Sequence, residues 1–234
     1  MVVLAVIGTK GSGKTATIEK LIKGLKRVGL KVATIKHIPE EGFTIDTPNK
    51  DTWRHAKAGA DIITAVSPNE IAIIRKTETK AMEIEQILAL LEDHVDVILI
   101  EGFKNLVKEK PNILKIVMVK DAKEAEEAEG IYRPILAFAG QKSLKLRSRI
   151  PYVDLTKDED ALMQILGPKI KVMLEKERER KSMVVRVAGN RVQINPFVRN
   201  ILRNTIMAML SSLKGVDLKG NEKIVVSVVR GENG

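Results

Sequence analysis

The stretch VVLAVIGTKGSGKT at residues 2–15 decides the fold of this 234-residue chain. Residues 2–7 are an unbroken apolar run rich in β-branched side chains, which is typical of a strand buried on both faces. The pattern GxxxxGKT follows at residues 8–15, and apolar residues then recur at helical spacing over residues 18–28. Strand, glycine-rich loop and helix in this order predict a P-loop that binds a nucleoside triphosphate.

The residue types in this loop suit phosphate chemistry. Glycines let the backbone turn sharply and point several N–H groups at a phosphate chain, and the positive end of the following helix adds to the anion site. Lys14 is expected to place its ammonium on the β- and γ-phosphates, and the Thr15 hydroxyl to hold Mg²⁺. The expected phosphate-binding residues are Gly8, Thr9, Lys10, Gly11, Ser12, Gly13, Lys14, Thr15 and Ala16.

The composition restricts the class of protein. A length of 234 residues allows one good-sized α/β domain and a small appendage, and 44% hydrophobic residues are enough for a core. The chain has no cysteine, which excludes disulfides and thiolate metal sites and makes the cytoplasm the expected location. No apolar run is long enough for a membrane span, and we expect a protein that does not associate with membranes.

The formal net charge of +10 indicates an anionic partner, and two interpretations compete. One is a nucleic acid. The other is a surface dense in Lys and Glu, like those of thermophiles, whose positive excess serves phosphorylated ligands. Aromatic residues make up only 3% of the chain, which argues against stacking platforms for single strands and favours the second interpretation.

The pattern along the chain predicts a mostly parallel sheet flanked by helices, the P-loop NTPase fold, over residues 1–175. Strands are expected at residues 31–36, 95–100, 113–119, 135–139 and 152–155, and a hairpin at residues 61–75. A helix opens near residue 158, and Gly167 and Pro168 are expected to interrupt or bend it. The charged run at residues 176–182 is interpreted as a linker.

Residues 183–234 are expected to form a small C-terminal α+β domain with the order β-β-α-β. A tight hairpin is predicted at residues 184–194, and Asn195 and Pro196 form the start signal of a helix. A last strand is predicted at residues 224–229. A unit of this size is marginal alone, so we expect it to pack on the main domain or on a second copy of itself.

Phosphate chemistry also needs an acidic group at the end of a neighbouring strand. Glu101 ends the buried strand at 95–100, and Asp46 lies in the long polar loop after the second strand. Either carboxylate has an ordinary alternative as a helix cap or loop residue. Other polar residues expected near the ligand edge are Lys36, His37, Lys50, Asp51, Arg54 and His55, which could equally be a solvated surface.

Several motifs together resemble the MobB family of molybdopterin-guanine dinucleotide biosynthesis adapter proteins. They are the P-loop, Lys36-His37, Asp46-x-Pro48-x-Lys50-Asp51-Thr52 with Arg54, Ala58-Gly59-Ala60, and Ile100-Glu101-Gly102-Phe103-Lys104. The resemblance covers about residues 1–175. Departures from the family pattern are Ile38-Pro39-Glu40 after Lys-His, and Asn49 where a glycine is usual.

The resemblance implies a homodimeric GTP-binding protein with weak GTPase activity. Such a protein would assist the guanylyltransferase that joins GMP to molybdopterin, in its molybdenum or tungsten form, with molybdopterin as a possible ligand. Lys14, Asp46 and Glu101 would carry the chemistry, and Thr15, Asp46 and Glu101 would hold Mg²⁺. The substrate side would be lined by Lys36, His37, Lys50, Asp51 and Arg54.

Two other functions stay open at the level of the residues. A small-molecule kinase using ATP would grip its acceptor with Lys50, Arg54 and His55. A nucleic-acid-binding module built on the basic tail would bind in a strongly salt-dependent way and ignore nucleotide. The base is not specified by the sequence, because Val119-Lys120-Asp121 is only a fragment of a guanine-reading motif.

Overall fold

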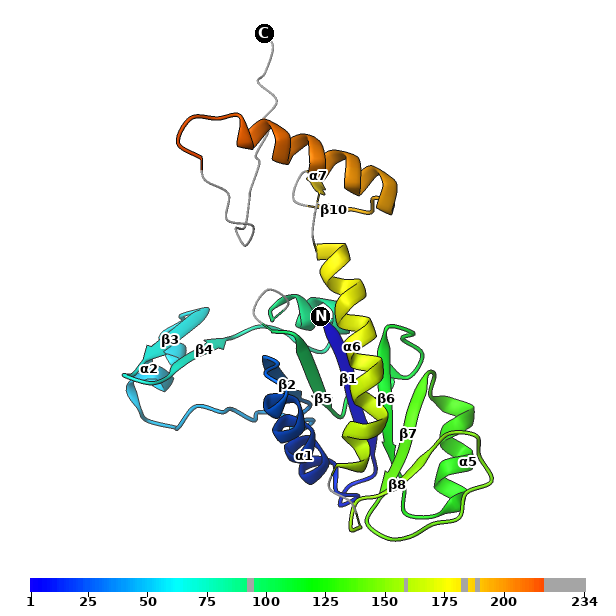
Figure 1. Ribbon diagram of the computed structural model, residues 1–234. Helices are drawn as coiled ribbons and strands as arrows, with labels where there is room; N and C mark the ends of the chain where they lie inside the picture. The colour runs from blue at the N-terminus through cyan, green and yellow to red at the C-terminus, as the bar shows by residue number, and fades with distance from the viewer. Residues whose placement is uncertain (92–94, 158–159, 182–184, 188–189, 217–234) are drawn as a thin grey trace. The chain divides into compact units, whose positions relative to one another are not determined.

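The computed structural model describes the chain except for residues 92–94, 158–159, 182–184, 188–189 and 217–234. The described residues divide into two compact units, the first from Met1 to Leu174 and the second beginning at Glu175. The first unit contains a six-stranded parallel sheet with the strand order β2-β5-β1-β6-β7-β8 (Figure 1). Its strands are β1 (Val2–Gly8), β2 (Val32–Lys36), β5 (Val97–Glu101), β6 (Ile113–Met118), β7 (Ile135–Gly140) and β8 (Tyr152–Asp154).

The predicted N-terminal strand lies in the interior of this sheet, between β5 and β6. Its side chains from Val2 to Ile7 are at most 5% exposed, so both faces of β1 are covered, as the apolar run predicts. The register aligns Val6 of β1 with Glu101 of β5, and Glu101 with Lys36 of β2. The carboxyl ends of the three strands therefore meet where the P-loop begins.

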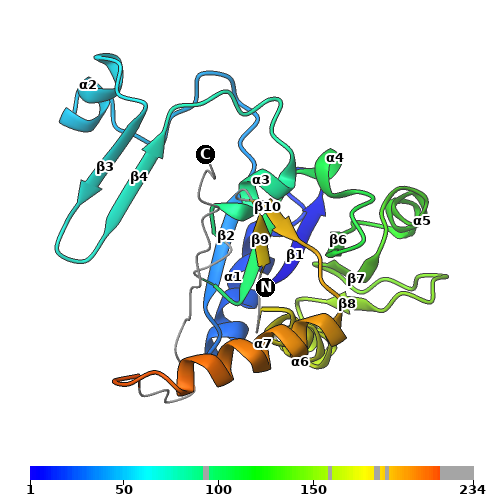
Figure 2. The same ribbon diagram turned by 90° about the horizontal axis from the view of Figure 1, so that it is seen from above.

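Helices cover both faces of the sheet (Figure 2). On one face α1 (Lys14–Arg27) and α6 (Ala161–Lys181) pack on the strands through residues such as Leu21, Leu25 and Leu166. The other face is covered by α3 (Ile84–Ala89), α4 (Lys104–Val107) and α5 (Ala122–Ile131). The expected P-loop NTPase architecture is thus confirmed, with two apolar clusters separated by the sheet.

A separate antiparallel hairpin is formed by β3 (Ile62–Val66) and β4 (Ile71–Arg75), as the sequence predicts. It follows α2 (Asp51–Lys57) and belongs to no larger sheet within the described part of the chain. Several of its large apolar side chains are more than half exposed, namely Ile62, Val66, Ile71 and Ile73.

The helix α6 continues through Pro168, where the sequence analysis expected a break or bend. A proline inside a helix removes one hydrogen bond and costs ~3 kcal/mol. Four leucines and isoleucines spaced four residues apart offset this cost, because all are buried against the same core: Leu162, Leu166, Ile170 and Leu174. Residues 176–181 of the expected linker are likewise helical, and residue 182 lies outside the described residues.

The second unit contains the short hairpin of β9 (Val185–Val187) and β10 (Asn190–Val192), followed by α7 (Pro196–Ser211). Asn195 caps α7, because its side-chain oxygen accepts a hydrogen bond from the Val198 N–H at 2.9 Å. The hairpin and the capped helix agree with the sequence prediction. The strand predicted at 224–229 lies outside the described residues.

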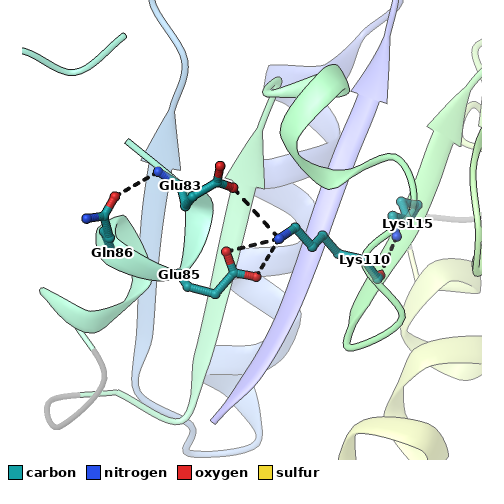
Figure 3. Close-up of polar contacts among 5 residues, drawn as sticks. All are labelled: Glu83, Glu85, Gln86, Lys110 and Lys115. Atoms are coloured by element: carbon teal, nitrogen blue, oxygen red, sulfur yellow. Dashed lines mark hydrogen bonds and ion pairs between the residues drawn. The ribbon is translucent and has the colours of Figure 1, made fainter. Parts of the chain in front are cut away.

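The amino end of the main sheet is held together by lysines (Figure 3). Lys115 on β6 is fully buried, and its ammonium donates to the carbonyls of Lys110 and Arg133, each at 2.6 Å. Burial lowers the pKa of Lys115 to about 8. Lys110 itself lies 2.9 Å from a carboxylate oxygen of Glu85 and 3.9 Å from one of Glu83. These contacts join the segments that precede β6 and β7.

Candidate functional site

The P-loop connects β1 to α1 at the carboxyl end of the sheet. Gly13 caps the helix in the left-handed conformation, with φ 89°, which favours glycine. A Cβ at this position would also lie 2.5 Å from the side-chain nitrogen of Gln141, so the space is closed to other residues unless Gln141 moves. The positive φ is therefore the main reason for glycine at position 13, since the Gln141 side chain is flexible and could shift.

The Lys14 side chain folds back onto its own loop. Its ammonium donates to the carbonyl of Thr9 at 2.7 Å and to that of Gly8 at 3.2 Å. Burial lowers the pKa of Lys14, Glu101 opposes that shift, and the lysines Lys104, Lys120 and Lys36 add to it. The bonding partners of Lys14 are thus its own loop carbonyls, which an incoming phosphate can replace.

Thr15 and Glu101 meet beside this lysine. The Thr15 hydroxyl donates to a carboxylate oxygen of Glu101 at 3.0 Å, and the Lys36 ammonium lies 3.7 Å from the same oxygen. Glu101 is held there because it ends β5 in register with Val6 and Lys36. The Glu101 side chain is only 15% exposed, so a cationic or donor partner compensates for the loss of water.

The residues present suit a magnesium ion bound together with phosphate. Mg²⁺ is held in such sites by one or two protein oxygens, with phosphate oxygens and water completing its shell. Thr15 and Glu101 supply a hydroxyl and a carboxylate within hydrogen-bonding distance of each other. Among the described residues no group of three or more His, Cys, Asp or Glu gathers into a metal cage.

A cavity of about 480 Å³ lies over these groups. It is lined by Lys10, Gly11, Gly13, Lys14, Thr15, Ala16, Lys36, Glu101 and Gln141. The structure thus brings together most of the predicted P-loop residues with Lys36 and Glu101. Three loop residues, Gly8, Thr9 and Ser12, do not line the cavity. Ser12 is buried, and the Thr9 carbonyl accepts hydrogen bonds from the Ser12 N–H and from the Lys14 ammonium.

His37 lies beside this cavity without lining it. Its ring packs on Phe103 with the ring centroids 4.5 Å apart, and its backbone N–H donates to the Glu101 carbonyl at 2.9 Å. Phe103 has a positive φ of 53°, an uncommon conformation for a non-glycine residue and one associated with functional segments. The pair therefore joins the end of β2 to the turn that follows Glu101 at the end of β5.

The other predicted residues lie away from the cavity. One carboxylate oxygen of Asp46 accepts from the Thr47 N–H and the Thr52 hydroxyl at 2.9 and 2.8 Å, so Asp46 organises the entry to α2. Its second oxygen has no hydrogen-bond partner among the described residues. Arg54 is exposed and lies 3.8 Å from Asp51, and neither these residues nor Lys50 line the cavity.

Three further side chains lie near the site: Gln141, which the sequence did not point to, and Lys104 and Lys120, which belong to quoted motifs but were given no role at the phosphates. Gln141 directly follows β7 and lines the cavity. Lys104 and Lys120 affect the pKa of Lys14 through their charges, and the Lys120 ammonium donates to the Lys10 carbonyl at 3.4 Å. All three lie just after a strand of the parallel sheet, a position where ligands collect. Their place after the carboxyl end of a strand was the feature in the sequence that could have pointed to them.

The described part of the chain contains no helix with the length and apolarity needed to cross a membrane.

Comparison with known proteins gives consistent relatives. A Methanocaldococcus jannaschii protein, provisionally named as a molybdopterin-guanine dinucleotide biosynthesis adapter protein, is 31% identical over 97% of this chain and 98% of its own length. The Escherichia coli molybdopterin-guanine dinucleotide biosynthesis adapter protein is 34% identical over 61% of this chain and 80% of its own length.

Solved structures agree in fold. A crystal structure of molybdopterin-guanine biosynthesis protein B matches with a TM-score of 0.56 and 22% identity, covering 73% of this chain and 99% of that one. A MobB homologue from Bacillus stearothermophilus matches with a TM-score of 0.55 and 22% identity, covering 74% and 99%. Residues 3–140 match the family MobB, described as molybdopterin guanine dinucleotide synthesis protein B. The chain belongs to the MobB family.

Proposed function

We propose that this chain is a GTP-binding adapter protein with weak GTPase activity in molybdenum or tungsten cofactor biosynthesis. It would assist the attachment of GMP to molybdopterin. The observation that carries the proposal is the meeting of Lys14 with the Thr15–Glu101 pair over one cavity in a MobB-family chain. The names of the relatives support the pathway, and the geometry supports the use of a nucleotide.

The residues of the cavity divide the work of binding a triphosphate. Loop N–H groups and the Lys14 ammonium bind the phosphates, while Lys36 adds positive charge at the far rim. Thr15 and Glu101 would hold Mg²⁺, which supplies further positive charge to the phosphates when bound. Glu101 is the one carboxylate among the described lining residues, and no arginine lines the cavity, so we expect slow turnover without a partner.

The adapter role calls for protein partners, and we propose a homodimer and a guanylyltransferase. The exposed apolar side chains of the β3–β4 hairpin support self-association, since such clusters on soluble proteins mark interaction sites. Light scattering over a range of concentrations would test the dimer.

We also propose molybdopterin as a ligand. The proposed location is the cytoplasm, and cell fractionation would test it.

The deciding experiment is isothermal titration of the full-length protein with non-hydrolysable analogues of GTP and ATP, with and without Mg²⁺. We expect binding of the GTP analogue that strengthens with Mg²⁺. A preference for ATP would instead favour the small-molecule kinase, and a stoichiometric phosphorylated product would then identify it. Absence of binding to both analogues would contradict the proposal.

Two substitutions test the proposed acidic residues. Glu101→Gln keeps the side-chain size but removes the charge facing Thr15 and Lys36, so we expect retained nucleotide binding with weaker Mg²⁺ dependence and about tenfold slower hydrolysis. Asp46→Asn gives the same result only if the loop of residues 37–50 approaches the phosphates. An unchanged rate in that variant would restrict Asp46 to its contacts with Thr47 and Thr52.

A further inference from the structure

The loop of residues 141–151, between β7 and β8, alternates between exposed and half-buried side chains. It lies at the β8 edge of the sheet (Figures 1 and 2). The alternation continues without interruption from Ser143 to Ile150. The half-buried apolar members pack on the core cluster that contains Phe138, and they are Leu144, Leu146 and Ile150. The exposed members after Ser143 are all basic, and we call them the cation row: Lys145, Arg147 and Arg149.

Hydrogen bonds hold the loop in place around the cation row. The Ser143 hydroxyl donates to the Asp154 carboxylate at 2.7 Å, and the Ile150 N–H donates to the Ser148 hydroxyl at 2.9 Å. The Tyr152 hydroxyl donates to the carbonyl of Lys142. A loop that is already ordered loses less conformational entropy when a partner binds. The row is therefore presented in a form that suits recognition.

The charge of the cation row is not neutralised by the part of the chain that the structure describes. Residues 141–153 contain no acidic residue. The next one, Asp154, accepts hydrogen bonds from Ser143 and Thr156 and lies 4.0 Å from the Lys157 ammonium. No ion pair joins a described carboxylate to the row, whereas other basic side chains of this unit, such as Arg27, face one.

We infer that the cation row docks an acidic segment of a partner protein beside the nucleotide site. The inference rests on the proposed function, in which that partner is the guanylyltransferase. The loop begins at Gln141, which lines the phosphate cavity, so a protein bound to the row lies next to the nucleotide. Charge complementarity of this kind speeds association and selects the partner.

The chemistry of the loop favours an acidic protein segment over a nucleic acid. Residues 141–151 contain no aromatic residue on which a base could stack. Two of the three cations are arginines, whose guanidinium groups match the geometry of a carboxylate. An extended peptide directs alternate side chains to one side, so carboxylates at every second position repeat with the period of the row.

Removal of the row's charge in the full-length protein tests the inference. The probe is a fluorescent peptide of alternating Glu and Ser residues, titrated at low salt and followed by anisotropy. In Lys145→Gln/Arg147→Gln/Arg149→Gln we expect affinity for the peptide to fall by about tenfold, since three exposed ion pairs are lost. The unfolding midpoint should stay near that of wild type, because the replaced side chains are exposed.

The matched control is Lys23→Gln/Lys169→Gln/Lys171→Gln, which removes the same formal charge from exposed positions of α1 and α6. It should bind the peptide within about twofold of wild type. An equal loss in both variants would overturn the inference, because the net charge alone would then attract the peptide. Absence of peptide binding by wild type would also overturn it.

Two further titrations separate the alternatives. An oligothymidylate that binds more tightly than the peptide, and depends more strongly on the row, would overturn the inference in favour of a nucleic acid. Affinity for the GTP analogue should stay within about twofold in the row variant. No residue of the row lines the phosphate cavity or the smaller cavity of about 290 Å³ beside it, which Lys20 and Thr156 line. A wild-type protein that binds the peptide through the row but no nucleotide would remove the proposed function and leave the docking surface.

Discussion

Two lysines at opposite ends of the same sheet make the same contacts for different purposes. Lys14 at the carboxyl end and Lys115 at the amino end each donate to two backbone carbonyls. Burial lowers the pKa of both side chains. Lys14, however, is partly exposed and bonds carbonyls of its own loop, whereas Lys115 is fully buried and bonds segments that precede two different strands.

The difference shows how one side chain can serve binding or stability. The partners of Lys14 lie five and six residues away in the chain, so it can release them without loosening other parts of the fold. Lys115 reaches the Arg133 carbonyl, 18 residues away, and its own side chain is fully buried, so removing its ammonium leaves carbonyls without their donor inside the fold. We therefore expect substitutions of these lysines to separate nucleotide affinity from folding stability.

The largest effect is expected from Lys14→Ala. It should weaken binding of the GTP analogue by roughly 100-fold, since a hydrogen bond to a charged group contributes about 1.5–3 kcal/mol. The unfolding midpoint should change little. Calorimetric titration and thermal unfolding measure the two quantities. Lys23→Ala, at an exposed position of α1 that lines neither cavity, is the control and should behave as wild type. Normal affinity in Lys14→Ala would contradict its role in phosphate binding.

Lys115→Met should give the opposite result. It keeps the length of the side chain but leaves the Lys110 and Arg133 carbonyls without their donor, which costs about 1–3 kcal/mol of unfolding free energy. Affinity for the GTP analogue should stay within about twofold of wild type. Chemical denaturation and titration measure these values. Stability equal to that of wild type would mean that the removal of a buried charge balances the two lost hydrogen bonds.

The pH dependence of stability sharpens the same comparison. The pKa of Lys115 is about 8 in the folded chain, below its ordinary value of 10.5, so the unfolded chain binds more protons between these values. The unfolding free energy of wild type relative to Lys115→Met should therefore rise from about pH 8 towards pH 10.5 and stay level below pH 8. The neutral amine still donates to both carbonyls. Denaturation series at pH 7, 8, 9 and 10 would show a flat difference if Lys115 titrates normally.

The smallest effect is expected from Lys110→Ala. Its ammonium faces Glu85 and Glu83 near the surface, and its backbone carbonyl, which Lys115 needs, is kept in the variant. Exposed ion pairs contribute little because water and salt screen them. Thermal unfolding should show a small decrease in the midpoint that disappears in high salt. A decrease as large as that of Lys115→Met would place the ion pair, and not the buried lysine, at the centre of the amino-end structure.

The sequence predicts the parts of the site that local rules control. The P-loop is contiguous, and Glu101 is found because it follows a buried run that ends at the carboxyl edge of the sheet. Asn195 and the two hairpins follow equally local signals. Each of these features depends on residues close together in the chain, which is why one sequence is enough to find them.

Features that depend on strand order could not be found in this way. Gln141 and Thr156 approach the P-loop only because β7 and β8 follow β6 in the sheet. Asp46 lies in a loop that no local rule positions relative to the phosphate cavity. The helix α6 runs through Pro168 because distant packing outweighs the proline penalty. Tertiary contacts decide all of these features, and the free energy of those contacts cannot be read from the local sequence pattern.

The contacts of Lys14 and Thr15 also have a thermodynamic consequence. Both side chains already have partners within the chain, the loop carbonyls and Glu101. Ligand entry is thus an exchange of partners, and each contact given up by a departing ligand is remade at once inside the protein. Such contacts stabilise the ligand-free protein relative to one whose side chains had no internal partners. We therefore expect the net affinity for the ligand to be lower than the new contacts alone would give, because each of them replaces an existing one.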